Sequence, residues 1–246
     1  MSEEERKSDK LTLVQLIPNM MTLTAICAGL TAIRFGLDMR YELAVQMILL
    51  AAILDGLDGR IARALGSDSK MGAELDSLAD FLNFGVAPAL ILYTWALEDT
   101  RGIGWLAVLV YAVCCVSRLA RFNVERKSGE EGKGGESAYF TGVPSPAGAL
   151  LVMLPMYASF AFADAPILPD LALSAWMAAI GYLMISKIPT WSFKTLKVSR
   201  GDVRLFFVGF VVVGAALLSF AWTSLVGLCI AYVVIVVWKL ATRARI

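Results

Sequence analysis

Four aspartates stand at helical spacing within one stretch of the sequence. Asp55 and Asp58 are three residues apart and Asp76 and Asp80 are four apart, so each pair shares one helix face. Two helices joined by a short turn at residues 66–69 would run nearly antiparallel and bring the two acidic faces together. Carboxylates in one pocket repel each other unless cations are present, and hard divalent cations prefer oxygen ligands. The spacing therefore predicts a site for Mg²⁺, with Mn²⁺ and Ca²⁺ as alternatives, at which two ions could clamp the oxygens of a phosphoryl transfer.

The same stretch contains residues that suit a phosphate ligand. Gly59 and Gly72 lack side chains, so a diphosphate or a nucleotide could approach the backbone, and Arg63 offers a planar fork for phosphate. The sequence contains no histidine, which leaves a carboxylate, a lysine, a cysteine or the substrate as proton acceptor. Solvated charges or salt bridges at helix ends are the alternative interpretation. We prefer that alternative for Asp68, Glu74 and Arg60 but not for the four aligned aspartates, because ionisable groups inside membrane spans usually have a function.

The rest of the chain has a membrane-like composition. Of the 246 residues, 58% are hydrophobic and 17% are charged, below the roughly 25% of a soluble domain. The net charge of +1 gives no indication of a nucleic-acid partner. We predict an all-α fold, a polytopic integral membrane helix bundle of about eight transmembrane helices with both termini cytoplasmic. The expected spans are residues 11–33, 43–54 with a continuation to 63, 72–97, 102–117, 142–163, 171–186 and the two halves of 205–238, divided near Trp222.

The distribution of basic residues predicts the orientation. With the N-terminus inside, all but three of the 22 Lys and Arg residues lie at the inner ends of the spans, the exceptions being Arg34, Arg40 and Arg101. This is a strong positive-inside bias. It places the four aspartates, and the later residues Arg118 and Arg121, at the cytoplasmic face of the cell membrane.

The spacing Asp-x-x-Asp-Gly-x-x-Ala-Arg, then eight residues, then Gly-x-x-x-Asp-x-x-x-Asp resembles the signature of the CDP-alcohol phosphatidyltransferases. The resemblance implies transfer of a phosphatidyl group from a CDP-linked lipid to an alcohol, with release of CMP. It also implies two divalent ions, one held by Asp55, Asp58 and Asp76 and the other by Asp55, Asp76 and Asp80, with Asp80 as general base. The CDP-lipid contacts that it implies are Asn19, Thr22, Gly59, Ala62, Arg63, Ser69 and Gly72.

A second cluster follows the span at residues 102–117. Arg118 and Arg121 share a helix face and could bind a phosphate or a carboxylate bidentately, whereas anchoring to lipid headgroups is the alternative. Charge alone is compatible with serine, glycerol 3-phosphate or inositol phosphate as acceptor. Residues 117–123, 140–148 and 183–186 resemble the integral-membrane phosphatidylserine synthase branch. This resemblance implies CDP-diacylglycerol, or an ether-lipid analogue, as donor and L-serine as acceptor, bound by Arg118, Arg121 and Asn123.

The family resemblance also implies a homodimer and contacts with membrane lipids. It divides the chain into three segments. We expect a polar cytoplasmic N-terminus at residues 1–10, a six-helix catalytic core at 11–190, and a basic connector with two additional spans at 191–246. Another acceptor within the family is one alternative. More remote alternatives are an intramembrane prenyltransferase, which needs a second acidic cluster, and an ion-coupled transporter, which favours mid-membrane carboxylates in related halves. Neither pattern is visible in the sequence.

Overall fold

The computed structural model describes residues 13–67, 69–100, 102–127, 139–162, 168–186, 189–191, 208–209, 211–212, 214–216 and 219–243. In these parts the chain is helical, apart from one two-stranded sheet. The chain divides into two compact units, Met1–Asp99 and Thr100–Ile246.

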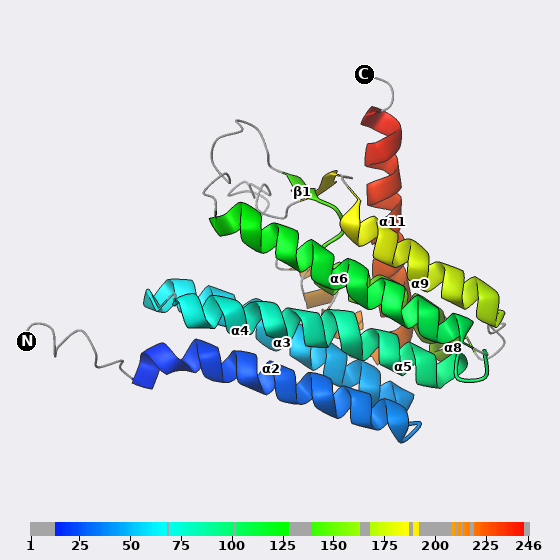
Figure 1. Ribbon diagram of the computed structural model, residues 1–246, viewed down its shortest axis with the longest axis horizontal. Helices are drawn as coiled ribbons and strands as arrows, with labels where there is room; N and C mark the ends of the chain where they lie inside the picture. Colours follow the sequence, from blue (N-terminus) through cyan, green and yellow to red (C-terminus); the bar gives the residue numbers. More distant parts are fainter. Residues whose placement is uncertain are drawn as a thin grey trace, which may run out of the picture. The chain divides into compact units, whose positions relative to one another are not determined.

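The first unit is a group of helices packed around α2. Its elements are α2 (Leu13–Leu37), α3 (Tyr41–Leu65), α4 (Lys70–Asp80), the π-helix η1 (Phe81–Val86) and α5 (Ala87–Ala96). α2 packs along α3 and also contacts α4, η1 and α5, and these helices lie side by side in Figure 1. Buried alanines, including Ala25 and Ala32 on α2 and Ala44 and Ala51 on α3, let the helix backbones approach closely.

The turn between α3 and α4 fixes the two helices that carry the aspartates. The predicted continuation of the second helix past residue 54 is confirmed, because α3 runs unbroken to Leu65. Gly66 then adopts a left-handed conformation with φ 59°, and the Ser67 amide donates to the Ala62 carbonyl at 3.0 Å. This is a Schellman ending, which satisfies carbonyls that the helix end would otherwise leave unpaired. Ser69 caps α4, since its hydroxyl oxygen accepts from the Gly72 amide at 2.9 Å.

A π-helical turn interrupts the long helical segment that begins with α4. In η1 the Ala87 amide donates to the Leu82 carbonyl, five residues earlier, instead of the usual four. Pro88 follows directly; it has no N–H to donate, and its ring crowds the carbonyl four residues before it. The wider turn accommodates this carbonyl. It begins at the residue after Asp80 and therefore sets the rotation of α4 relative to α5.

The second unit has five helices with described bounds and a small sheet, besides a few helical residues between 208 and 219. The helices are α6 (Ile103–Lys127), α7 (Ser145–Val152), α8 (Leu154–Ala161), α9 (Asp170–Ile185) and α11 (Ala221–Arg243). α6 packs along α9, and α11 packs against α8 (Figure 1). Strands β1 (Tyr139–Thr141) and β2 (Pro189–Trp191) pair antiparallel, with Phe140 opposite Thr190. The all-α prediction therefore holds for the helical layers but missed this short sheet.

The span expected at residues 142–163 is divided into two short helices. α7 ends at Val152 and α8 begins at Leu154, with Met153 between them. Pro155 lacks the N–H that would bond to the Leu151 carbonyl, so that oxygen is left without its helical partner. It instead accepts a hydrogen bond from the Trp176 indole nitrogen on α9, at 3.1 Å. The break is thus held in place by a contact with the neighbouring helix.

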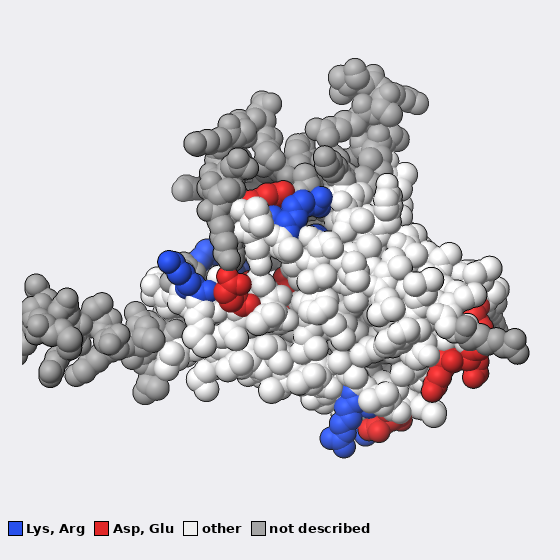
Figure 2. Space-filling model, in the orientation of Figure 1, with Lys and Arg blue, Asp and Glu red and all other residues white. Residues whose placement is uncertain are grey.

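The structure supports a helical membrane protein. Within the described residues, four segments are long and apolar enough to cross a membrane, namely Leu16–Leu37, Lys70–Ala96, Ile103–Glu125 and Ala221–Trp238. Most of the surface seen in Figure 2 is uncharged. Exposed apolar side chains include Val113 on α6 and Val234 on α11. Eight spans and cytoplasmic termini stay predictions, and much of the chain expected to form the connector and the seventh span lies outside the described residues.

Candidate functional site

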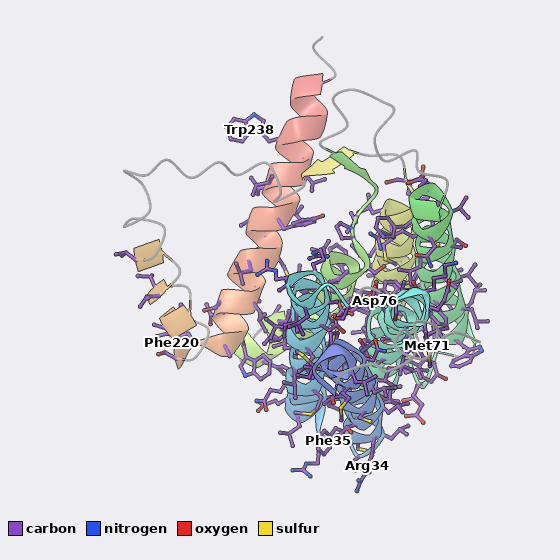
Figure 3. All side chains as sticks on the ribbon, turned by 90° about the vertical axis from the view of Figure 1, so that its left-hand side faces the viewer. Arg34, Phe35, Met71, Asp76, Phe220 and Trp238 are labelled. Carbon is purple, nitrogen blue, oxygen red and sulfur yellow. The ribbon has the colours of Figure 1, made fainter. Side chains whose placement is uncertain are left out.

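The four aspartates come together in the first unit. Asp55 and Asp58 lie on α3, and Asp76 and Asp80 lie on α4. The Asp55 carboxyl is hydrogen-bonded to that of Asp80 and is close enough to Asp76 and Asp58 to interact with their charges. In Figure 3, Asp76 lies on the side of α4 nearer to α3, whereas the exposed Met71 lies on the outer side. The acidic faces of the two helices thus meet around Asp55.

The four aspartate carboxylates are ligands that a divalent cation prefers, although their side chains do not enclose an ion in this structure. No group of three or more Asp, Glu, His or Cys side chains in the described ranges is arranged closely enough to hold a metal ion. Asp55 Oδ1, however, is buried and has no hydrogen-bond partner among the described residues. Two carboxyl groups in contact repel each other unless a proton or a cation lies between them, and a divalent cation can take that place. The clustered carboxylate oxygens and the unpaired Oδ1 fit a hard ion such as Mg²⁺ or Mn²⁺.

Asp58 is fixed in position by hydrogen bonds within the protein. Its side chain is only 3% exposed. One carboxylate oxygen lies 2.6 Å from the Thr22 hydroxyl of α2, and the other accepts from the Gly59 amide at 2.5 Å. The Thr22 hydroxyl also lies 3.1 Å from the Pro18 carbonyl, and its single proton can serve only one of these acceptors at a time. Thr22, which the family resemblance places against the CDP-lipid, therefore contacts a predicted metal ligand.

Three of the predicted CDP-lipid residues lie together where α2 meets the start of α4. A Cβ on Gly72 would lie 2.9 Å from Asn19 Oδ1 and 3.0 Å from Ser69 Oγ, so only glycine leaves this junction without crowding. The Ser69 oxygen already accepts the Gly72 amide proton. Polar oxygens from two helices thus surround a patch of bare backbone, which is an arrangement that can receive a phosphate or a nucleotide group.

The other predicted CDP-lipid residues lie on the last turns of α3. Gly59 follows Asp58, and the exposed Arg63 stands one turn further, with its Nη1 3.8 Å from where a Gly59 Cβ would lie. Ala62 is half-buried, and its carbonyl accepts the Ser67 amide of the Schellman ending. An exposed guanidinium beside a glycine can reach a phosphate that approaches the aspartates.

The predicted acceptor residues all lie on α6, in the second unit. Arg118 donates from Nη1 to the hydroxyl of Ser145 at 2.5 Å, and Arg121 donates to the Ile185 carbonyl at 3.2 Å, near the end of α9. Asn123 is half-buried on the following turn. Ser145 is fully buried as the first residue of α7. It was not predicted as a site residue. Its place between Pro144 and Pro146, where a helix starts, and the family resemblance of residues 140–148 were the available indications.

The two downstream segments that resemble the phosphatidylserine synthase branch pack against each other. Gly142 has a positive φ of 86°, and a Cβ there would overlap the Met184 carbonyl oxygen. The Val143 amide donates to the Leu183 carbonyl at 3.2 Å, and Gly148 lies against the Met184 side chain. Segments 142–148 and 183–186 therefore form one structural unit, which presents Ser145 to Arg118.

Comparison with known proteins identifies the family of this chain and several relatives. Residues 15–186 match the CDP-alcohol phosphatidyltransferase family. A protein of Mycobacterium leprae is 42% identical over 210 residues, which are 85% of this chain and 69% of that protein. A protein of Mycobacterium tuberculosis is 45% identical over 176 residues, 72% of this chain and 61% of the relative. One of Bacillus subtilis is 38% identical over 179 residues, 72% of this chain and 91% of the relative. All three relatives are named CDP-diacylglycerol–serine O-phosphatidyltransferase.

The family match covers both α3 and α4, which carry the aspartates, and the segments that hold Arg118 and Ser145. The chain belongs to the CDP-alcohol phosphatidyltransferase family.

Proposed function

We propose that this protein transfers the phosphatidyl group of CDP-diacylglycerol, or of an ether-lipid analogue, to the hydroxyl of L-serine, releasing CMP and forming phosphatidylserine. The observation that carries the proposal is the meeting of four aspartates, from α3 and α4, around Asp55 in a chain of this family. The names of the mycobacterial and Bacillus relatives support serine as the acceptor.

In the proposed mechanism, Asp55, Asp58 and Asp76 would hold one divalent ion, and Asp55, Asp76 and Asp80 the other. When bound, two such ions neutralise the diphosphate charge and stabilise the attacking and leaving oxygens. Thr22 holds Asp58 in position from α2. The metal ligands thus come from two helices whose spacing is set by the short turn between Leu65 and Lys70.

The chain's own residues bind both substrates and move one proton. Asn19, Ser69 and Gly72 receive the nucleotide end of the donor, and Arg63 contacts its diphosphate. Asp80 accepts the proton of the serine hydroxyl, whose oxygen forms a new bond to the phosphorus that carries the diacylglycerol. The bond from that phosphorus to the bridging oxygen breaks, and its electron pair leaves with CMP. Proton removal by a positioned carboxylate is general base catalysis.

The second unit supplies the acceptor site in this proposal. Arg118, held by the buried Ser145, binds the serine carboxylate, and Arg121 and Asn123 line the same site. The reaction takes place at the cytoplasmic face of the cell membrane, and the protein works as a homodimer. Apolar helices in both units support a membrane location.

A screen of acceptors tests the proposal. Purified protein is incubated with CDP-diacylglycerol and with L-serine, glycerol 3-phosphate or inositol phosphate, and CMP release is measured with and without EDTA. We expect CMP with serine alone, lost in EDTA and restored by excess Mg²⁺ or Mn²⁺. CMP release with glycerol 3-phosphate or inositol phosphate but not with serine would overturn the assignment of serine as the acceptor. A prenyltransferase or a transporter would release no CMP with any of them.

A further inference from the structure

The C-terminal helix α11 lies outside residues 15–186, which match the family, yet it packs closely in the second unit. Leu225, Val226 and Cys229 on its inner face are buried, and Tyr232 follows one turn later. We propose that α11 completes the acceptor site through Tyr232, whose hydroxyl donates a hydrogen bond to the anionic group of the acceptor bound at Arg118. This inference rests on the proposed function, because it deepens the description of the same acceptor site.

Two contacts define how α11 runs along α7 and α8. The Trp222 ring packs edge-on against Phe160 of α8, with the ring centroids 4.9 Å apart. About two turns further along α11, Cys229 Sγ lies 3.6 Å from the Leu150 carbonyl oxygen of α7. Moving forward on α11 therefore corresponds to moving backward through α8 and α7. One more turn of α11 brings Tyr232 to the level of the start of α7, where Ser145 lies.

The electrostatic contacts agree with this register. Tyr232 is close enough to Arg118 to feel the charge of its guanidinium, and Arg118 in turn donates to Ser145. The Tyr232 hydroxyl oxygen is buried, and within the described ranges it has no hydrogen-bond partner. A buried tyrosine hydroxyl normally finds one.

An anionic acceptor would provide the missing partner. A carboxylate bound by a guanidinium has lone pairs left over, and it can accept a further hydrogen bond from a phenol hydroxyl. Arg118, Ser145 and Tyr232 come from α6, α7 and α11, so the polar groups around the bound anion are supplied by three different helices. The ligand class is a small alcohol with a carboxylate, as in serine; a phosphate has the same hydrogen-bonding capacity.

The test is the variant Tyr232→Phe, which removes the hydroxyl and keeps the ring. Initial rates of CMP release are measured in the full-length protein while serine and CDP-diacylglycerol are varied separately. We expect the KM for serine to rise by about tenfold, with kcat and the KM for CDP-diacylglycerol changed by less than about twofold. The control is Tyr182→Phe on α9, whose side chain is 66% exposed and which should leave all three constants unchanged.

The outcomes separate this inference from a purely structural role. Unchanged constants would overturn it. A lower kcat with a rise in the KM values for both substrates would also overturn it, because that result indicates a packing or water-binding role for the hydroxyl. Combining Tyr232→Phe with Arg118→Lys should cost less than the sum of the two single changes if both residues bind one group. Wild-type protein that uses a phosphorylated alcohol instead of serine overturns the serine assignment alone, because the same KM comparison with that acceptor still decides the role of Tyr232.

Discussion

Asp55 and Asp58 lie one helical turn apart, but their carboxylates have different hydrogen-bond partners. Asp58 is buried and both of its oxygens have protein partners, Thr22 and the Gly59 amide. Asp55 keeps Oδ1 buried and unpaired among the described residues and reaches across to Asp80 with its carboxyl group. In the proposed metal site, Asp58 is therefore a ligand whose orientation the protein fixes, and Asp55 is one of the two ligands, with Asp76, that both ions share.

Replacing Thr22 by Val tests the support of Asp58. The substitution removes the hydrogen bond from the Thr22 hydroxyl to the Asp58 carboxylate. A hydrogen bond to a charged group typically contributes about 1.5–3 kcal/mol. We expect the Mg²⁺ concentration for half-maximal CMP release to rise about tenfold. The matched control is Thr24→Val on the same helix, because the exposed Thr24 hydroxyl donates to the Met20 carbonyl at 2.8 Å and not to an aspartate among the described residues. Equal metal dependence in the two variants would show that Thr22 does not orient a metal ligand.

Replacing Asp80 by Asn tests the proposed base. The amide cannot take up the serine proton, so CMP release should fall by about 10²-fold or more while the protein stays folded. Asp38→Asn is the control, since Asp38 is an exposed aspartate with a 3.8 Å ion pair to Arg34. Normal turnover in Asp80→Asn would exclude Asp80 as base.

At the scale of elements, the close contact between α2 and η1 decides how the helices of the first unit fit. Asn83 on η1 is fully buried, and its side-chain oxygen lies against Gly29 on α2, where a Cβ would overlap it. The Asn83 amide has no hydrogen-bond partner among the described residues. Its place is therefore set by shape, and the glycine provides the space for it.

Replacing Gly29 by Ala should destabilise the first unit by about 1–3 kcal/mol, the usual cost of overpacking. The apparent Tm in detergent should fall, and the additional change Asn83→Ala should restore most of the loss. Gly56→Ala on α3 is the control, because nothing lies within 4 Å of a Cβ there, and alanine favours a helix over glycine. If Gly29→Ala unfolds at the wild-type temperature, the contact between α2 and η1 is not tightly packed.

The sequence was most informative where the structure depends on local spacing. The paired aspartates follow from helical periodicity, and the turn after Leu65 follows from Gly66 and the cap from Ser69. The contacts that position the site are not local: Thr22 and Asp58 are 36 residues apart, and Arg118 and Ser145 are 27 apart. No periodic pattern encodes such pairs, because they depend on how helices pack. The break at Met153 was foreseeable from Pro155, but the continuous apolar run concealed it.

At the scale of the whole molecule, the proposed reaction needs the aspartates and the arginines of α6 on the same side of the membrane. The positive-inside bias predicts this arrangement. The residues proposed to bind the donor belong to the first unit and those proposed to bind the acceptor belong to the second, so the proposed mechanism requires a particular orientation of the spans.

Cysteine labelling tests the predicted orientation. The four native cysteines are replaced, and a single cysteine is introduced by Thr100→Cys or by Ser128→Cys. A membrane-impermeant maleimide applied to intact cells should label position 100, expected outside. Position 128, expected inside, should react only after permeabilisation. The opposite pattern would show that the orientation is inverted. Labelling of both positions in intact cells would show that no span separates them.

The π-helical turn at Phe81–Val86 has a consequence for comparing sequences of this kind. A residue in an α-helix advances by about 100° around the axis. Deleting one residue from this turn would therefore swing Asp76 and Asp80 through more than a quarter of a circle, while Ile91 keeps its place against Gly36. A relative could then retain every letter of the aspartate signature and still point its second pair of acids away from the first. The length of the segment after the signature belongs to the functional pattern as much as the aspartates do.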